Sequence, residues 1–201
     1  MKSAALLWAT AVGVAIACAA KASEMTAPIE QLNAGLLQAM KAGKASPFRQ
    51  RYDLLAPFVV RAVDLDIILQ NGVGPSWASL PADQQAALRT AFQHYSIATY
   101  VAHFDEFAGE HFDLLIPGGN DQVVRVKIVP GSPRGEAHVL GYVMRQSAGG
   151  WKAIDVTADS TTSQVVAQQE EIRSVFKSSG VGGLLARLQQ KTAELSGGTV
   201  Q

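Results

Sequence analysis

The sequence contains very little cysteine, and the single one, Cys18, falls in an N-terminal segment that we expect to be removed. Lys2, the apolar run over 4–17 and the small-residue motif over 20–22 form the three regions of a secretory signal peptide, so we predict cleavage after Ala22. The mature chain would then have no thiol for a disulfide, a zinc site or a nucleophile. The alternative is a lipoprotein box over 15–18, although it lacks the usual bulky aliphatic first residue.

An excess of basic residues and a second long apolar run are also missing. The chain has 17 Lys and Arg against 17 Asp and Glu, and loss of Lys2 and Lys21 leaves 15 basic residues. A slightly acidic chain argues against nucleic acid as a partner, because phosphate binding needs a basic surface. No run after residue 22 reaches the roughly 20 apolar residues that span a bilayer. We therefore expect a soluble periplasmic protein.

Enzyme motifs are absent as well. The sequence has no Gly-x-Ser-x-Gly nucleophile elbow and no Gly-x-x-x-x-Gly-Lys phosphate loop. Asp64 and Asp66 fall on different sides of a predicted helix, and His94 has no nucleophile or orienting acid at a suitable spacing. The sequence therefore predicts no catalytic residues and no cofactor.

Apolar periodicity predicts an α+β fold for the single domain over 23–201. The part over 25–108 is mostly helical, with predicted helices over 25–40, 47–59, 64–69 and 81–107, and Pro57 is expected to kink the second. After Gly109 the period changes to two, which predicts strands over 111–116, 122–129, 137–146 and 151–157 within a sheet region over 110–158. C-terminal helices follow within 163–195, over 163–176 and 181–195, separated by Gly180. We expect helices on one face of a twisted antiparallel sheet of about four strands, with the long helix over 81–107 coating it.

The segment over 103–113 (HFDEFAGEHFD) holds two histidines and four carboxylates, which raises the question of a metal site. His103 and His111 are eight residues apart across a predicted helix end, and so do not form the i, i+4 pair that places two ligands on one helical face. We favour a structural interpretation, in which the charges are solvated at a helix terminus and a sheet face while Phe104 and Phe107 anchor the segment. The alternative is a metal site completed by residues from elsewhere in the chain.

The feature of the sequence that points to a function is a set of apolar side chains on the predicted helices and on the strands that face them. These residues suit either an ordinary core or a cavity between the sheet and the helices. They are Phe58, Ile68, Trp77, Tyr95 and Phe104 from the helices, and Val124, Val126, Ile128, Leu140, Tyr142, Met144, Ile154 and Val156 from the strands.

Several short motifs, in order along nearly the whole mature chain, resemble the Mla-type periplasmic lipid-binding family (MlaC-like), also called the toluene-tolerance family. They are FRQRYDLLAP (48–57), GPSW (74–77), LPADQQ (80–85), FQHYSIATY (92–100), GWKAIDV (150–156), QQEEI (168–172) and GVGGL (180–184) followed by Leu188. The run from Ser96 to Phe112 is more similar to the branch encoded with hopanoid biosynthesis (HpnM). The sequence departs from the family over 158–163 (ADSTTS), where a Gly and a Ser are usual.

This resemblance implies a hydrophobic cavity between the sheet and the helices, lined by the thirteen residues named above, that holds lipid tails. It also implies a non-enzymatic carrier that shuttles phospholipid or hopanoid between an inner-membrane transport complex and the outer membrane. Two alternatives remain: an adaptor of the transporter that carries no lipid, and a small-molecule enzyme on a cone-shaped α+β fold, with Asp113 or Asp155 as its acid. We expect Asp155, at the end of its strand, to make a turn or cap bond instead.

Overall fold

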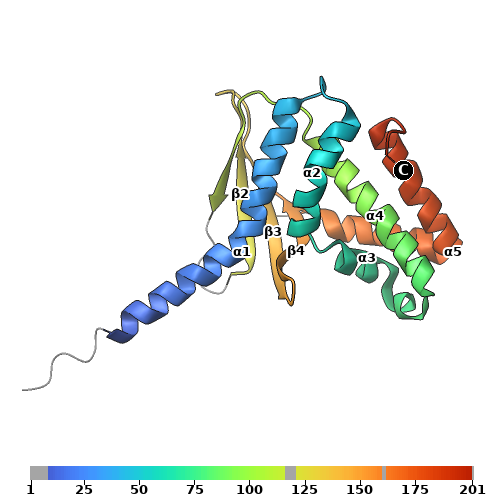
Figure 1. The fold of residues 1–201 in the computed structure, drawn as a ribbon, viewed down its shortest axis with the longest axis horizontal. Coiled ribbons are helices and arrows are strands. Elements are labelled where there is room, and N and C mark those ends of the chain that lie inside the picture. Colours follow the sequence, from blue (N-terminus) through green and yellow to red (C-terminus); the bar gives the residue numbers. More distant parts are fainter. Residues whose placement is uncertain (1–8, 116–120, 160–161, 201) are drawn as a thin grey trace, which may run out of the picture.

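The computed structural model describes residues 9–115, 121–159 and 162–200, and it has the α+β architecture expected from the sequence (Figure 1). The helices are α1 (Ala9–Ala42), α2 (Phe48–Ala62), α3 (Leu65–Val73), the 3-10 helix η1 (Gly74–Ser79), α4 (Ala82–His103) and α5 (Gln164–Ser196). The strands are β1 (His111–Leu115), β2 (Val123–Val129), β3 (His138–Ser147), β4 (Gly150–Ala158) and β5 (Thr162–Ser163). Ile116 and the predicted turn over 117–120 lie outside the described residues, as does the start of the predicted signal peptide.

Local sequence explains where several helices begin. Pro47 precedes α2, and the helix continues through Pro57 to Ala62. The Asp64 side chain accepts a hydrogen bond from the Ile67 amide (3.2 Å) and so caps α3. The Ser163 hydroxyl accepts one from the Val166 amide (2.9 Å) and caps α5. Such caps satisfy amide groups that the first helical turn leaves without partners.

The helix α4 ends at His103, four residues earlier than the sequence predicted. Phe104 leaves the helical conformation (φ −116°, ψ 64°), and its ring lies between those of Tyr100 (6.3 Å between centroids) and Phe112 (6.2 Å). Contact with the first strand therefore ends the helix. Phe107, expected as an anchor, is instead 41% exposed, with the Lys41 ammonium over its ring.

The strands form an antiparallel meander in the order β1-β2-β3-β4-β5. The short β5 adds to the four strands that were predicted, and β4 continues to Ala158, so Asp155 lies inside the strand and not at its end. A bulge between Val143 and Met144 leaves Ile154 as the extra residue of β4. Bulges of this kind bend a strand and increase its twist.

The helices form layers over one face of the sheet. In Figure 1, α1 lies in front of the strands, with α2 beside it and α4 and the end of α5 progressively farther to the right. The helices that approach the strand backbones most are α1, α2, α3 and α5, whereas α4 packs mainly on α5, α2 and α3. The expectation that the long helix α4 coats the sheet directly was therefore wrong: it reaches the strands through large side chains.

The last helix, α5, is a helical hairpin. Gly180 interrupts it with φ 61° and ψ −160°, a conformation that only glycine adopts readily. The sequence predicted two helices separated at this residue, and the structure confirms the break. The two halves of α5 consequently lie close enough to share the pocket described below.

Candidate functional site

The sheet presents an apolar face to the helices. Strand residues alternate between the two faces, so Val124 and Val126 in β2, and Tyr142 and Met144 in β3, point to the same side. All four are completely buried, as is Ala153 in β4. On β2, Lys127, which points to the opposite face, is exposed. The helices cover this face with Leu36, Leu55, Ile68 and Leu69, which are also buried.

The structure brings the residues predicted to line a lipid site into one interior. Six are buried: Ile68, Trp77, Val124, Val126, Tyr142 and Met144. Five are half-buried and pack against them: Phe58, Tyr95, Phe104, Leu140 and Val156. The other two, Ile128 and Ile154, are also half-buried; Ile128 pairs with Phe112 near the sheet edge, and Ile154 is the bulge residue.

The prediction included Phe104 but not the other two residues, Tyr100 and Phe112, that bridge α4 and the sheet. Tyr100 stacks on Phe104, whose ring contacts Phe112 in β1, so an aromatic row extends from the interior to the sheet edge. Ser96, one helical turn before Tyr100, is buried. The buried surface of α4 is wide, because the helix is covered on the side that carries Leu88 and Phe92 and also on the side that carries Ile97 and Val101. In the sequence, apolar residues on more than one side of this helix, including Ile97 and Val101, are the signal that could have identified Tyr100 as an interior residue.

Polar atoms within this interior lack partners among the described residues. The Tyr142 hydroxyl and the Ser96 hydroxyl are both buried and form no hydrogen bond. Burial raises the pKa of Tyr142 well above its usual value, and the neighbouring Tyr100 phenol raises it further. Burial also raises the pKa of Tyr100 to about 12. Both phenols therefore stay neutral in an apolar environment.

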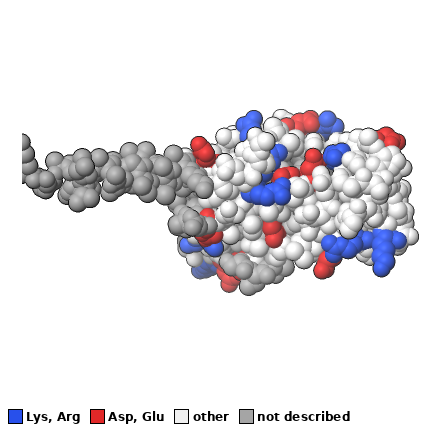
Figure 2. Space-filling view, turned by 90° about the horizontal axis from the view of Figure 1, so that it is seen from below, with Lys and Arg blue, Asp and Glu red and all other residues white. Residues whose placement is uncertain are grey.

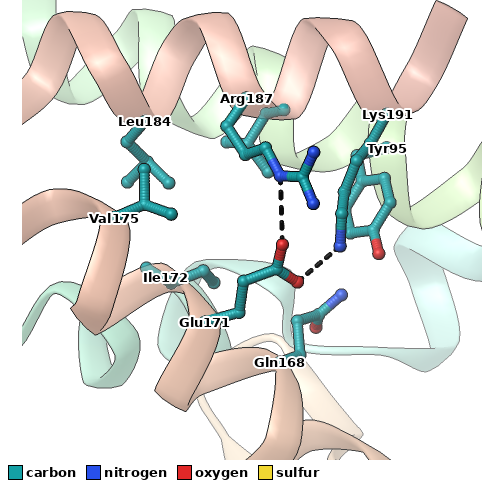
Figure 3. A pocket seen from close by; sticks show the side chains of 9 residues that line it. Tyr95, Gln168, Glu171, Ile172, Val175, Leu184, Arg187 and Lys191 are labelled. Carbon is teal, nitrogen blue, oxygen red and sulfur yellow. Dashed lines mark hydrogen bonds and ion pairs between the residues drawn. The ribbon is translucent and has the colours of Figure 1, made fainter. Parts of the chain in front are cut away.

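A small pocket lies at the α5 hairpin, against α4 (Figure 3). Its floor is apolar, with Ile172, Val175, Leu184 and Leu188. Its charged groups are paired: Glu171 binds Arg187 (3.2 Å) and Lys191, as Figure 3 shows. The Lys191 ammonium also lies 5.2 Å from the centre of the Tyr95 ring. Among the residues predicted to bind lipid, only Tyr95 lines this pocket.

The charged segment over 103–113 is dispersed, as the structural interpretation expected. The His103 ring nitrogen Nδ1 lies 2.8 Å from the Thr99 carbonyl oxygen, and Asp105 and Glu106 both pair with Lys44. His111 and Asp113 are 3.7 Å apart and exposed. Within the described ranges, no three His, Cys, Asp or Glu side chains are placed to hold a metal ion together.

The candidate catalytic acids have ordinary structural contacts. Asp155 accepts a hydrogen bond from the Ser163 hydroxyl (2.7 Å) and one from the Val156 amide (2.7 Å). It forms no helix cap itself but binds Ser163, the residue that caps α5. Asp64 caps α3 and pairs with Arg145 (3.2 Å), while Asp66 pairs with Arg89 (3.4 Å). These contacts tie each acid to the fold.

The molecular surface carries charges of both signs. On the face in Figure 2, Lys and Arg are interspersed with Asp and Glu and separated by wide areas of other residues. Among the helices in the described parts of the chain, none is sufficiently long and apolar to span a membrane.

Comparisons with known proteins agree with this geometry. Residues 30–190 match the family described as MlaC protein. The fold is similar to a solved structure of the phospholipid-binding protein from Ralstonia solanacearum in complex with a phospholipid, with a TM-score of 0.69 and 21% sequence identity, over 86% of this chain and 98% of that chain. No curated protein sequence matches this chain. The match to the family extends over most of the sequence, and the resemblance indicated by the motifs is confirmed at this level: the chain belongs to the MlaC family.

Proposed function

We propose that this protein is a periplasmic carrier that binds phospholipid between the apolar face of its sheet and the covering helices. The observation that carries the proposal is the continuous apolar interior built from β2, β3 and the helices, in a chain of the MlaC family. The Ralstonia solanacearum protein of the same fold is a phospholipid-binding protein. MlaC proteins are in general periplasmic, which fits the predicted signal peptide over 1–22.

The energetics of lipid transfer make such a carrier useful. Each buried CH₂ group contributes about 0.8 kcal/mol, so a 16-carbon tail exposes on the order of 10 kcal/mol of apolar surface to water. An aqueous compartment is therefore a barrier between two membranes. A protein that encloses the tails lowers this barrier. The residues that we propose to contact the tails are twelve of the thirteen predicted from the sequence, all but Tyr95, which lines the α5 pocket, together with Tyr100 and Phe112.

The proposal extends to the partners and to the cargo. The carrier would receive or deliver lipid at an inner-membrane transport complex and exchange it with the outer membrane, by transient docking. Hopanoid is proposed as a second cargo, because the run from Ser96 to Phe112 resembles the hopanoid-associated branch. The aromatic row Tyr100, Phe104 and Phe112 lies within this run and offers flat surfaces to a rigid polycyclic lipid.

Native mass spectrometry of the mature protein from a hopanoid-producing host tests the proposal. We expect a mass increase equal to one bound lipid, and organic extraction followed by lipid analysis would identify it. Mild purification is needed, because detergent removes bound lipid. Protein that is repeatedly empty, and that also fails to take up phosphatidylglycerol from vesicles, would contradict a carrier function.

A second candidate is an adaptor that docks on the transport complex without carrying lipid. One observation favours it: the side chains of the interior already pack closely enough to leave Val124, Val126, Tyr142 and Met144 with no exposed surface. An adaptor would bind the transport complex with its interior filled. A carrier must instead separate the covering helices from the sheet to admit a lipid tail. Lipid uptake therefore distinguishes the two functions.

A further inference from the structure

Two hydroxyl groups of the interior have no partner although they are deeply buried. Ser96 is 6% exposed and Tyr142 is fully buried, and neither hydroxyl forms a hydrogen bond within the described parts of the chain. A buried polar group without a partner costs free energy, so folded proteins usually supply one. A pair of such groups in one interior indicates a missing partner.

These hydroxyls come from opposite layers of the structure. Tyr142 lies in the middle of the sheet, with Val124 of β2 and Val156 of β4 as its neighbours. Ser96 and Tyr100 are one turn apart on the same side of α4. The Tyr100 phenol is close enough to Tyr142 for the two groups to influence each other's pKa. Three hydroxyls thus occupy the layer between α4 and the sheet, which is the layer proposed to admit lipid.

The surroundings favour an uncharged partner. Burial is the main influence on both phenols, and no cation among the described residues lowers either pKa. A charged head group would lose its hydration here without gaining an opposite charge, which is unfavourable. A neutral oxygen is suited to the site, because hydroxyls can donate hydrogen bonds to a carbonyl and can donate to or accept from a hydroxyl.

We propose that Ser96, Tyr100 and Tyr142 form a binding site for one uncharged oxygen atom of the lipid, either an ester carbonyl or a hydroxyl, inside the otherwise apolar interior. This inference rests on the proposed carrier function and adds a chemical requirement to it. An interior that is only apolar binds tails according to their length. The three hydroxyls would also fix the depth at which the lipid is held.

Matched lipid pairs test this site. Delipidated full-length mature protein would be loaded with a fluorescent fatty acid, and its displacement measured with dipalmitoyl phosphatidylglycerol and its diether analogue, which lacks both carbonyls. Palmitate and 16-hydroxypalmitate form the second pair. We expect the protein to prefer the oxygen-bearing member of one pair by about fivefold, as one hydrogen bond would give. A preference within the phosphatidylglycerol pair identifies the bound oxygen as a carbonyl, and a preference within the palmitate pair identifies it as a hydroxyl.

Variants connect this preference to the hydroxyls. Tyr142→Phe and Ser96→Ala each remove one hydroxyl, so the preference should fall to about twofold or less, while binding of the lipid without the oxygen stays unchanged. Tyr95→Phe is the matched control, because Tyr95 lies on the same helix but faces the α5 pocket. The control should keep the preference of the unmodified protein. Circular dichroism would confirm that each variant is folded, and Ser96→Ala alone suffices if Tyr142→Phe does not fold.

The outcomes separate this inference from the function on which it rests. If no lipid of either pair binds, the carrier function fails. If lipids bind but neither pair is discriminated, or if the variants discriminate as the unmodified protein does, the hydroxyls hold a structural water only and the inference is overturned. A preference that disappears in Ser96→Ala or Tyr142→Phe and persists in Tyr95→Phe supports it.

Discussion

The interior beneath α4 and the pocket at the α5 hairpin are both apolar regions that contain polar side chains. They differ in whether these polar side chains have partners. In the pocket, Glu171 is neutralised by Arg187 and Lys191, and Lys191 also contacts the Tyr95 ring. In the interior, the hydroxyls of Ser96 and Tyr142 have no partner in the described chain. Polar groups that pair with one another, as in the pocket, can be explained by their contribution to folding alone. Buried hydroxyls without a hydrogen-bond partner, as in the interior, suggest a partner from outside the chain. This contrast supports the proposal that ligand binds in the interior, and it favours a structural role for the pocket.

The largest effect is expected from a charge placed in the interior. Val126 is completely buried on the helix-facing side of β2, so Val126→Asp would bury a carboxylate without a partner. We expect the free energy of unfolding to fall by about 4 kcal/mol or more. Urea denaturation followed by circular dichroism measures this loss. Lys127→Asp, one residue further on the exposed side of the strand, is the matched control and should lower the stability by no more than about 1 kcal/mol, because the new carboxylate is solvated although it lies opposite Asp113. Equal effects at the two positions would mean that the sheet has no buried face here.

An intermediate effect is expected at the bend of the hairpin. Gly180 has φ 61° and ψ −160°, so Gly180→Ala should destabilise the protein by about 2 kcal/mol through backbone strain, although no atom crowds the new methyl group. Gly182→Ala is the control, because Gly182 lies in the helix with open space around it and alanine favours helix by about 1 kcal/mol. Thermal or urea unfolding should therefore show opposite signs for the two substitutions. Destabilisation by both would contradict the assignment of strain to Gly180 alone.

The smallest effect is expected in the pocket, where Glu171→Gln removes both ion pairs. Partial burial acts to raise the pKa of Glu171, but the ion pairs with Lys191 and Arg187 outweigh it and lower the pKa. A lowered pKa contributes stability above the unfolded-state value of about 4.3, and this contribution is lost as the pH falls through the folded-state pKa. We expect the unmodified protein to be more stable than the variant by roughly 1 kcal/mol at pH 7, because the groups are partly exposed.

That difference should disappear once the pH falls below the folded-state pKa of Glu171, and high salt should reduce it at pH 7. Unfolding curves of the two proteins at several pH values measure it. Glu170→Gln, at the preceding position of the same helix, is the matched control. A difference between the unmodified protein and Glu171→Gln that is independent of pH would show that shape, and not charge, holds the hairpin.

The sequence predicted the fold well where local patterns determine the structure. The alternation in β2 identified Val124 and Val126 as buried, and Gly180 marked the break in α5 because a single glycine between two periodic segments disrupts a helix. The family resemblance was confirmed by the match over 30–190. These features depend on residues close together in the chain.

Features that depend on distant contacts were predicted less well. The end of α4 at His103 is determined by packing of Phe104 against Phe112, and the helix itself packs on other helices rather than on the strands. Tyr100 and Tyr142, whose phenols influence each other's pKa without forming a hydrogen bond, are 42 positions apart in the sequence, and no periodicity reveals their proximity. The candidate lipid site was therefore identified as a set of apolar residues, while its hydroxyls became apparent only from the three-dimensional arrangement.

The junction between α2 and α3 has a consequence for the order of folding. Val63 forms a parallel bridge with Ala153 of β4, the Asp64 amide donates to the Ala153 carbonyl (2.8 Å), and Lys152 donates to the Val60 carbonyl (2.9 Å) across 92 positions of sequence. The hairpins of the meander join neighbouring segments, so their loops close at a lower entropic cost than this junction. We expect the sheet to form early and the N-terminal helices to dock late. Until they dock, the apolar face of the sheet is open to water, and a lipid present at that stage would find its binding surface uncovered.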